Sequence, residues 1–330
     1  MVSILKTLIS LILSLLSVFN LTGIFGSTEG NDYNVKNEKD ILLDFAAISD
    51  IHMTDDYFHR IMLESGLADM DNAVNKPDAL ILAGDMTDDG LEADYENLKK
   101  AFSAYNPAEN ILMAMGNHDT WTDEDDRYEP AKANFVKYSK EIAGRELTES
   151  YYSTEINGYT FIVMASEDTH VAAYISSAQL NWLRAEMDKA SEKGLPIFVV
   201  SHWPIAFTHG LPETWGEEDM DPMDGSFGDQ NDEVVAILND YENVFLISGH
   251  IHNGLSNEKN ADKNGYASVE TYGTLHSINL PSFMYPSERG NFMNGCGYSF
   301  EVYENEVVLR ARNFATGSWL TDYDVTIPLV

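Results

Sequence analysis

Short apolar runs alternate with longer amphipathic stretches along this chain, and this alternation restricts its fold more than any other feature. The apolar runs lie at 41–49, 79–83, 111–115, 159–165, 196–200 and 244–248. Each run has the length of one β-strand and is mostly apolar, as in strands that are buried on both faces. Five longer stretches between the runs predict helices, at 57–75, 91–104, 131–143, 178–191 and 233–238. The pattern predicts an α/β protein whose strands are covered by helices.

The pattern changes after Gly249. Strand-like pieces follow at 272–280, 296–303 and 307–312. No stretch in this tail predicts a helix of comparable length, so we expect the tail to complete a second sheet. The helix at 178–191 has Ser177 as its predicted N-cap. One folded domain is predicted to extend over 41–330.

Residues 7–28 carry no charge and follow Lys6, which is typical of a secretory leader. The small residues near the end of this segment form no clear cleavage site, and the segment is long enough to remain as a membrane anchor. We favour cleavage because three serines and an asparagine interrupt the apolar run. Residues 1–28 are therefore predicted to be a secretory leader or an N-terminal anchor, and 29–40 a polar spacer. The expected location is secreted or extracytoplasmic, with a membrane tether only if the leader is retained.

The chain is strongly acidic, with 54 Asp and Glu against 20 Lys and Arg and a formal net charge of -34. This charge repels phosphate backbones and anionic membranes, so we expect no nucleic-acid partner. A small phosphorylated substrate is compatible with it, because bound metal ions invert the local field. The single cysteine, Cys296, excludes an intramolecular disulfide and a thiolate zinc cluster. Two acidic stretches, 123–126 and 217–225, are interpreted as solvated loops.

Five short polar motifs each begin where a predicted strand stops. They are Asp50-Ile51-His52, Gly84-Asp85, Gly116-Asn117-His118-Asp119, Ser201-His202 and Gly249-His250-Ile251-His252. In open α/β sheets, ligands bind beyond the carboxyl ends of the strands, so we expect the motifs to converge. Two residues separated by one position on an extended strand end point the same way, as in Asp50 and His52. The glycines are expected to permit the unusual backbone of these sharp turns.

The motifs contain seven candidate metal ligands, and these combine imidazole, carboxylate and amide groups. They are Asp50, His52, Asp85, Asn117, His202, His250 and His252. Such a set suits Zn, Fe or Mn. Seven ligands are too many for one tetrahedral ion, whereas two ions about 3.5 to 4 Å apart would use them all and would clamp a phosphoryl group for in-line attack.

Each of these residues alone also has a structural interpretation. Asp85 is compatible with a helix N-cap, His202 with a hydrogen-bonded core imidazole and Asn117 with a turn. Five such motifs at five strand ends favour a shared metal site over these separate roles.

In this order the motifs resemble the pattern D-x-H, G-D, G-N-H-[DE], H and G-H-x-H of the calcineurin-like metallophosphoesterases. The resemblance extends from about residue 41 to residue 252. It implies a two-sheet β-sandwich flanked by helices, in four layers α/β/β/α. It implies that one metal ion is held by Asp50, His52, Asp85 and His252. It implies that the other ion is held by Asp85, Asn117, His202 and His250, so that Asp85 bridges the two.

The resemblance also implies roles for the remaining residues of the third motif. His118 is similar to the family histidine that is not a ligand and faces the leaving group, and Asp119 would orient its ring. Elementary chemistry agrees, because a histidine beside a carboxylate can stay protonated and donate a proton to an alkoxide.

The segment 84–90 is similar to that of class III cyclic-nucleotide phosphodiesterases. Asp88 and Asp89 stand where purple acid phosphatases carry a tyrosine ligand, which disfavours that branch. Thr120 and Trp121 follow the third motif where the cyclic-nucleotide enzymes often have an arginine. A fixed guanidinium for the phosphate is therefore not provided at this place.

Together these features predict hydrolysis of a phosphodiester or phosphomonoester by a hydroxide that bridges two Mn, Fe or Zn ions, divalent or of mixed valence. The alternative is a non-catalytic extracellular metal-binding or surface-interaction module. The His118–Asp119 pair disfavours that alternative, because a structural metal site needs no proton donor. Candidate substrate-binding side chains are Trp121, Trp203, Trp215, His209 and His276. A packing role for Trp203 is an equally good interpretation.

Overall fold

The chain is described by a computed structural model over residues 33, 41–121, 128–168, 172–212, 214, 223–257, 259, 261, 264–285, 287, 289 and 293–330. The predicted leader, the acidic stretch 123–126 and Trp215 lie outside the described residues. Among the described helices, none has the length and apolar character needed to cross a membrane.

The first sheet is built around three buried parallel strands. These are β1 (Leu43–Ile48), β2 (Ala79–Ala83) and β3 (Asn110–Ala114). The chain returns to the free edge of β1 with antiparallel strands near its C-terminus. These are β10 (Cys296–Val302), β11 (Glu306–Asn313), β12 (Ser318–Trp319) and β13 (Val325–Pro328).

This placement corrects the expectation that 296–303 and 307–312 complete a second sheet. β2 pairs with only one edge of β1, and β10 takes the other edge. The pairing places Phe300 opposite Phe45, and the two rings stack with centroids 4.5 Å apart. Burial of an otherwise unpaired strand edge therefore determines which sheet the tail joins.

The second sheet has the strand order β4-β5-β6-β7-β9-β8. Its strands are β4 (Tyr152–Ile156), β5 (Tyr159–Val163), β6 (Ile197–Val200), β7 (Val244–Ser248), β8 (Val269–Tyr272) and β9 (Leu275–Asn279). The run 272–280 predicted as one strand contains the end of β8, a turn at Gly273 and β9. β4 and β8 lack a continuous apolar run because each lies at an edge of the sheet and is partly exposed.

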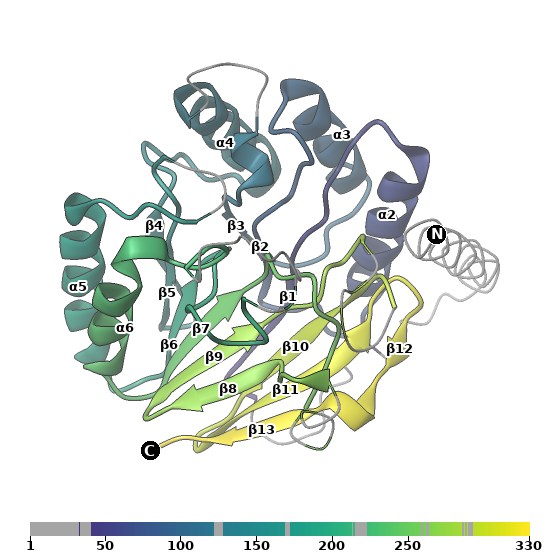
Figure 1. Cartoon of the computed structure of the whole chain (residues 1–330). Helices are drawn as coiled ribbons and strands as arrows, with labels where there is room; N and C mark the ends of the chain where they lie inside the picture. The colour runs from purple at the N-terminus through teal and green to yellow at the C-terminus, as the bar shows by residue number, and fades with distance from the viewer. Residues whose placement is uncertain are drawn as a thin grey trace.

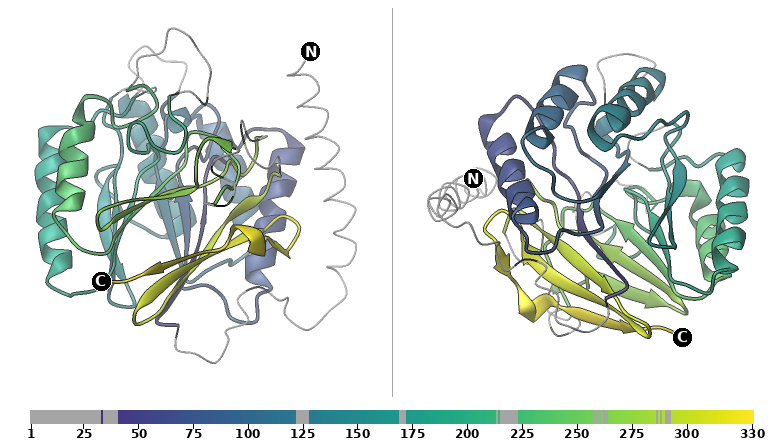
Figure 2. Two further views of the ribbon diagram at one scale, coloured as in Figure 1. Left: turned by 60° about the horizontal axis from the view of Figure 1, so that its bottom comes forward. Right: turned by 180° about the vertical axis from the view of Figure 1, so that it is seen from behind.

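In the described part of the chain, five α-helices cover the outer faces of the two sheets (Figures 1 and 2). They are α2 (Tyr57–Asp71), α3 (Glu92–Phe102), α4 (Tyr128–Ala143), α5 (Ser177–Ser191) and α6 (Asn231–Asn239). Side chains of α2, α3 and α4 share a buried cluster with the outer face of the first sheet, and those of α5 and α6 share one with the second. A third cluster fills the space between the sheets. The predicted two-sheet sandwich flanked by helices is confirmed. The N-cap of α5 is Ser176 rather than Ser177, because the Ser176 hydroxyl accepts from Gln179 N–H.

One residue of the predicted polar spacer belongs to the folded domain. Tyr33 is fully buried, with its ring centroid 5.5 Å from that of Phe314 and 5.9 Å from that of Trp319. The guanidinium of Arg312 lies over the Tyr33 ring at 5.0 Å and forms a bidentate ion pair with Asp69. Tyr33 thereby packs into the outer core of the first sheet.

We expect Tyr33→Ala to lower the free energy of unfolding by about 3 kcal/mol, the usual result of truncating a fully buried aromatic ring. Tyr57→Ala is the control, since 61% of Tyr57 is exposed, and it should change stability by no more than about 0.5 kcal/mol. Urea unfolding of both variants makes the comparison. Equal stabilities of the two variants would show that Tyr33 is not anchored in the core.

Candidate metal centre

The loops after β1, β2, β3, β6 and β7 bring the seven candidate ligands together. Three groups of described side chains have ligand atoms close enough to hold an ion, and Asp85 belongs to two of them. The group without Asp85 is His52, Asp88 and His118, beside the other two. The first ligand group is Asp50, His52, Asp85 and His252. The second ligand group is Asp85, His202 and His250, with the Asn117 amide oxygen 3.0 Å from His202 Nε2. These are the two sets that the resemblance implied, and the assignment of individual ligands stays a prediction.

The ligand loops continue the hydrogen-bond ladder of the sheet beyond the strands. Asp50 N–H donates to Gly84 O over 3.1 Å, and His52 N–H donates to Asp85 O over 2.9 Å. His250 N–H donates to both carboxylate oxygens of Asp50 at 3.2 Å. Backbone bonds therefore hold the side chains of separate loops at fixed positions around one centre.

Left-handed backbone, rather than extended strand, turns the side chains toward the centre. Nine non-glycine residues in the described chain have positive φ, and five of them are candidate ligands. These five are Asp50, His52, Asp85, His250 and His252, with φ between 46° and 73°. The expectation that the pairs Asp50/His52 and His250/His252 lie on extended strand ends is therefore wrong. Strained backbone of this kind persists only where the surrounding structure holds it, and it concentrates at functional sites.

The three motif glycines leave room for ligand side chains. A Cβ at Gly84 would collide with His202, one at Gly116 would collide with Asp85, and one at Gly249 would collide with Ser49 and Asp50. Only Gly84 has a positive φ among them. Close packing against ligands, more than backbone freedom, therefore requires glycine at positions 116 and 249.

Hydrogen bonds orient the two imidazoles that lie deepest in the centre. His202 Nδ1 donates to Ala83 O over 2.9 Å, and His52 Nδ1 bonds Asp88 Oδ1 over 3.0 Å. In each ring the opposite nitrogen, Nε2, faces the other ligands: His52 Nε2 lies 3.1 Å from His252 Nε2, and His202 Nε2 lies 3.1 Å from His250 Nδ1. This is how metal-binding histidines are usually held, with one nitrogen fixed by an oxygen and the other available to the ion.

Charge and burial make the centre strongly attractive to cations. Burial raises the pKa of Asp50, but His252 and His202 outweigh it and lower this pKa to about 2. Burial lowers the pKa of His202, but Asp85 and Asp50 outweigh it and raise this pKa to about 9. Burial and the charge of His202 lower the pKa of His250 to about 3. The ionised carboxylates of Asp50 and Asp85 are thus buried together and require positive charge beside them.

The donor set fits two transition-metal ions. Donor atoms bound at about 2.0–2.1 Å around a tetrahedral ion lie roughly 3.3 Å from each other. In the first ligand group His252 Nε2 is 3.0 Å from Asp50 Oδ1, and His52 Nε2 is 3.7 Å from Asp85 Oδ2. In the second, His202 Nε2 is 3.1 Å from Asp85 Oδ2. The atoms are therefore already spaced as ligands of shared ions would be.

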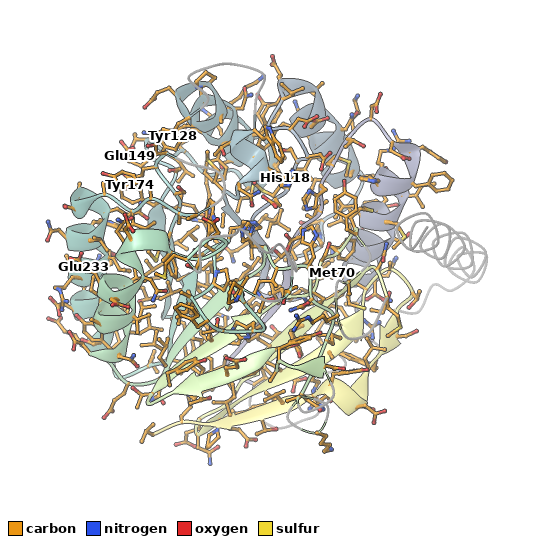
Figure 3. All side chains as sticks on the ribbon, viewed as in Figure 1. Met70, His118, Tyr128, Glu149, Tyr174 and Glu233 are labelled. Carbon is orange, nitrogen blue, oxygen red and sulfur yellow. The ribbon has the colours of Figure 1, made fainter. Side chains whose placement is uncertain are left out.

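His118 lies beside the ligand groups, but Asp119 does not orient it. Figure 3 shows His118 near α3 and α4, and its ring centroid is 4.5 Å from that of His52. His118 Nδ1 donates to the backbone oxygen of Asp88 over 2.7 Å and lies 3.6 Å from Asp88 Oδ1. Asp119 is buried and instead accepts from Gly116 N–H and from both the N–H and the hydroxyl of Thr87. The predicted role of Asp119 is corrected: it joins two ligand loops, and Asp88 orients the His118 ring.

Two of the proposed substrate-binding side chains are enclosed by protein. Trp203 is 1% exposed and packs against the rings of His202 and His250, which supports the packing interpretation. His209 is fully buried, with Nδ1 bonded to Ala267 O and Nε2 to Ser277 Oγ. Neither side chain is open to a substrate, so these two expectations are corrected.

The other candidates lie at different places. Trp121 is 41% exposed, and its ring centroid is 4.9 Å from that of His118, so it stands at the open side of the centre. His276 instead lines a separate cleft of about 730 Å³ bordered by β8 and β13. Substrate contact therefore remains a prediction for Trp121. His276 lines a cleft away from the metal centre, so its position does not support a substrate-binding role there.

Sequence reasoning missed two residues of the centre. Asp88 was visible as the second aspartate of the segment 84–90, three positions after Asp85, and its spacing was the available signal. Tyr285 has no local signal: its hydroxyl donates to Asp88 Oδ1 over 3.1 Å, and its ring centroid is 4.5 Å from that of His52. Tyr285 follows the last ligand motif in the sequence, and only the fold brings it to the centre.

A helix-flanked double sheet with a buried carboxylate and imidazole cluster at its strand ends defines the scaffold of a metal-dependent hydrolase. The sequence model of the calcineurin-like phosphoesterase family matches residues 43–254, about two thirds of the chain. The chain belongs to this family, and it is a dinuclear metallophosphoesterase.

Similar proteins support this membership. A 3′,5′-cyclic-nucleotide phosphodiesterase of Nostoc sp. is 27% identical over 225 residues, which cover 66% of this chain and 73% of that protein. A protein of Arcobacter nitrofigilis named probable glycerophosphodiester phosphodiesterase is 24% identical over 56% of this chain and 59% of its own length. The crystal structure of a dimetal phosphatase from Danio rerio shares the fold, with a TM-score of 0.59, 13% identity and coverage of 88% of this chain and 100% of that one.

We expect Gly116→Ala to weaken metal binding roughly 10- to 100-fold while the protein stays folded, because its methyl group displaces the Asp85 carboxylate. Titration of metal-free protein with Mn²⁺ against a competing chelator gives the affinity, and circular dichroism checks the fold. Gly144→Ala is the control, since a Cβ there meets no atom within 4 Å and adds only local backbone strain. Unchanged affinity in Gly116→Ala would contradict the ligand role of Asp85.

Proposed function

We propose that this protein hydrolyses small phosphodiesters in a metal-dependent reaction. The observation that carries the proposal is the arrangement of two ligand groups that share Asp85, with the His118 ring beside them. When bound, two ions of Mn, Fe or Zn supply a bridging hydroxide as nucleophile and neutralise charge on the phosphoryl oxygens. The names of the two similar phosphodiesterases support the same reaction class.

His118 supplies the proton for the leaving group in this proposal. Its Nδ1–H is committed to the Asp88 carbonyl, so Nε2 is the ring atom that holds and delivers a proton. Its side chain is 23% exposed, whereas His52 beside it is fully buried, which places His118 at the solvent side of the ligands. A partly exposed imidazole next to the reacting group is well suited to proton donation and to recovery of the proton from water.

The charges around the centre favour a diester over a monoester. The charges that lower the pKa of Asp50, Asp85 and Asp88 most belong to histidines and not to an arginine or lysine. The two described ligand groups that share Asp85 include no guanidinium of the kind that usually binds a phosphomonoester dianion, and the whole chain is acidic. A singly charged phosphodiester meets a smaller electrostatic cost.

The proposal also places the protein outside the cytoplasm. The uncharged segment 7–28 after Lys6 supports this location. Cell fractionation and N-terminal sequencing of the recovered protein test it, because a cleaved leader yields soluble protein that starts after the segment, and a retained leader yields membrane-bound protein.

Removal of the shared carboxylate should abolish turnover. We expect Asp85→Asn to reduce hydrolysis of bis(p-nitrophenyl) phosphate to the level of metal-free protein, because both ligand groups lose their common charge. The exposed Asp232→Asn is the matched control and should keep full activity. Assays use protein stripped by chelation and reloaded with Mn, Zn or Fe. Metal-loaded wild type that binds ions but hydrolyses neither diesters nor p-nitrophenyl phosphate would instead support a non-catalytic metal-binding module.

The leaving group should determine how much activity depends on His118. For a diester with an alkoxide leaving group, we expect His118→Ala to lower kcat roughly 10²- to 10⁴-fold, because the alkoxide must be protonated. For bis(p-nitrophenyl) phosphate the loss should be much smaller, since nitrophenolate departs without a proton. Parallel kcat measurements on the two substrates give the ratio. Equal losses on both would contradict proton donation by His118.

A further inference from the structure

A segment beyond the family match forms one wall of the metal centre. The family model ends at residue 254, and residues 282–285 follow β9. Ser282 forms a β-bridge with Ser49, and Phe283 N–H donates to Ser49 O over 2.9 Å. Met284 N–H donates to the backbone oxygen of Asp50 over 3.2 Å. The segment is therefore fixed to the stretch of chain that carries a candidate ligand.

Tyr285, at the end of this segment, contacts both candidate histidine ligands of the first group. Its ring stacks on His252 with centroids 5.7 Å apart and lies against His52 at 4.5 Å. Its backbone N–H donates to the Ser282 hydroxyl over 3.0 Å, which fixes the main chain at this residue. The Tyr285 ring thus limits the movement of two imidazoles at once.

The hydroxyl of Tyr285 contacts a third side chain, that of Asp88. It donates to Asp88 Oδ1 over 3.1 Å, and the same oxygen is 3.0 Å from His52 Nδ1. One carboxylate oxygen therefore receives the phenol and the imidazole together. Because Asp88 is 27% exposed, it would otherwise be able to turn toward water and release the His52 ring.

We propose that Tyr285 is a positioning residue of the metal centre, which holds the Asp88 carboxylate so that His52 keeps its Nε2 directed at the ion of the first ligand group. The inference rests on the metal site of the proposed function, but not on its phosphodiesterase activity. Oxygen partners that orient a ligating histidine commonly change metal affinity 10- to 100-fold when they are lost. Tyr285 acts one step further out, through Asp88.

Tyr285→Phe tests the proposal, because it removes the hydroxyl and keeps the ring that packs on the histidines. We expect one of the two metal-binding steps to weaken by roughly 10-fold or more, with the other step little changed. Titration of metal-free protein with Co²⁺ reads both steps, and the visible spectrum of bound Co²⁺ reports the ligand geometry of each ion. Tyr138→Phe is the matched control, since the Tyr138 hydroxyl also donates to a carboxylate, Glu96, on the surface helices. It should leave both steps unchanged.

A double-mutant cycle separates positioning from general packing. If Tyr285 acts through Asp88, Tyr285→Phe has no further effect on metal affinity in an Asp88→Ala background. Losses that add in the double variant, or two unchanged binding steps in Tyr285→Phe, would overturn the proposal. A wild-type protein that binds both ions and hydrolyses no phosphoester would contradict the proposed function instead, because the readout here is affinity and spectrum rather than turnover.

Discussion

The carboxylate of Asp85 is buried at the centre of the ligand cluster. Much of the surrounding structure compensates this charge in place of water. His118 N–H donates to Asp85 Oδ1 over 2.8 Å, and His202 Nε2 lies 3.1 Å from Oδ2. Gly116 has no Cβ because Asp85 occupies the space where one would lie. An isolated buried carboxylate is costly, so the fold must surround it with donors, imidazoles and metal ions.

The two-sheet sandwich makes such crowding possible. Parallel strands of both sheets end at the same side of the molecule, and each contributes a short loop to the centre. The loops remain hydrogen-bonded to one another beyond the strands, which stabilises five ligand residues in left-handed backbone. Helices α2 to α6 and three hydrophobic clusters supply the stability on which this strained edge depends.

Much of the fold was predictable because its central strands are buried on both faces and therefore read as apolar runs. β2 and β7 were predicted with their observed ends. The edge strands β4 and β8 were not predicted, because partial exposure removes that signal. The sheet joined by β10 and β11 depends on which strand edge is left open, and this is a property of the assembled sheet rather than of any local sequence.

The sequence by itself determined which side chains form the two candidate ligand groups that share Asp85, since metal chemistry demands particular donor groups and these stand at strand ends. Tertiary structure decided how each is used. Asp88 rather than Asp119 orients His118, because the fold brings the backbone oxygen of Asp88 to the His118 ring, although Asp119 is its neighbour in the sequence. His209 is enclosed, and Tyr285 reaches the centre from the segment that follows β9. Contacts between segments far apart in the chain have no local sequence pattern, so only the folded structure reveals them.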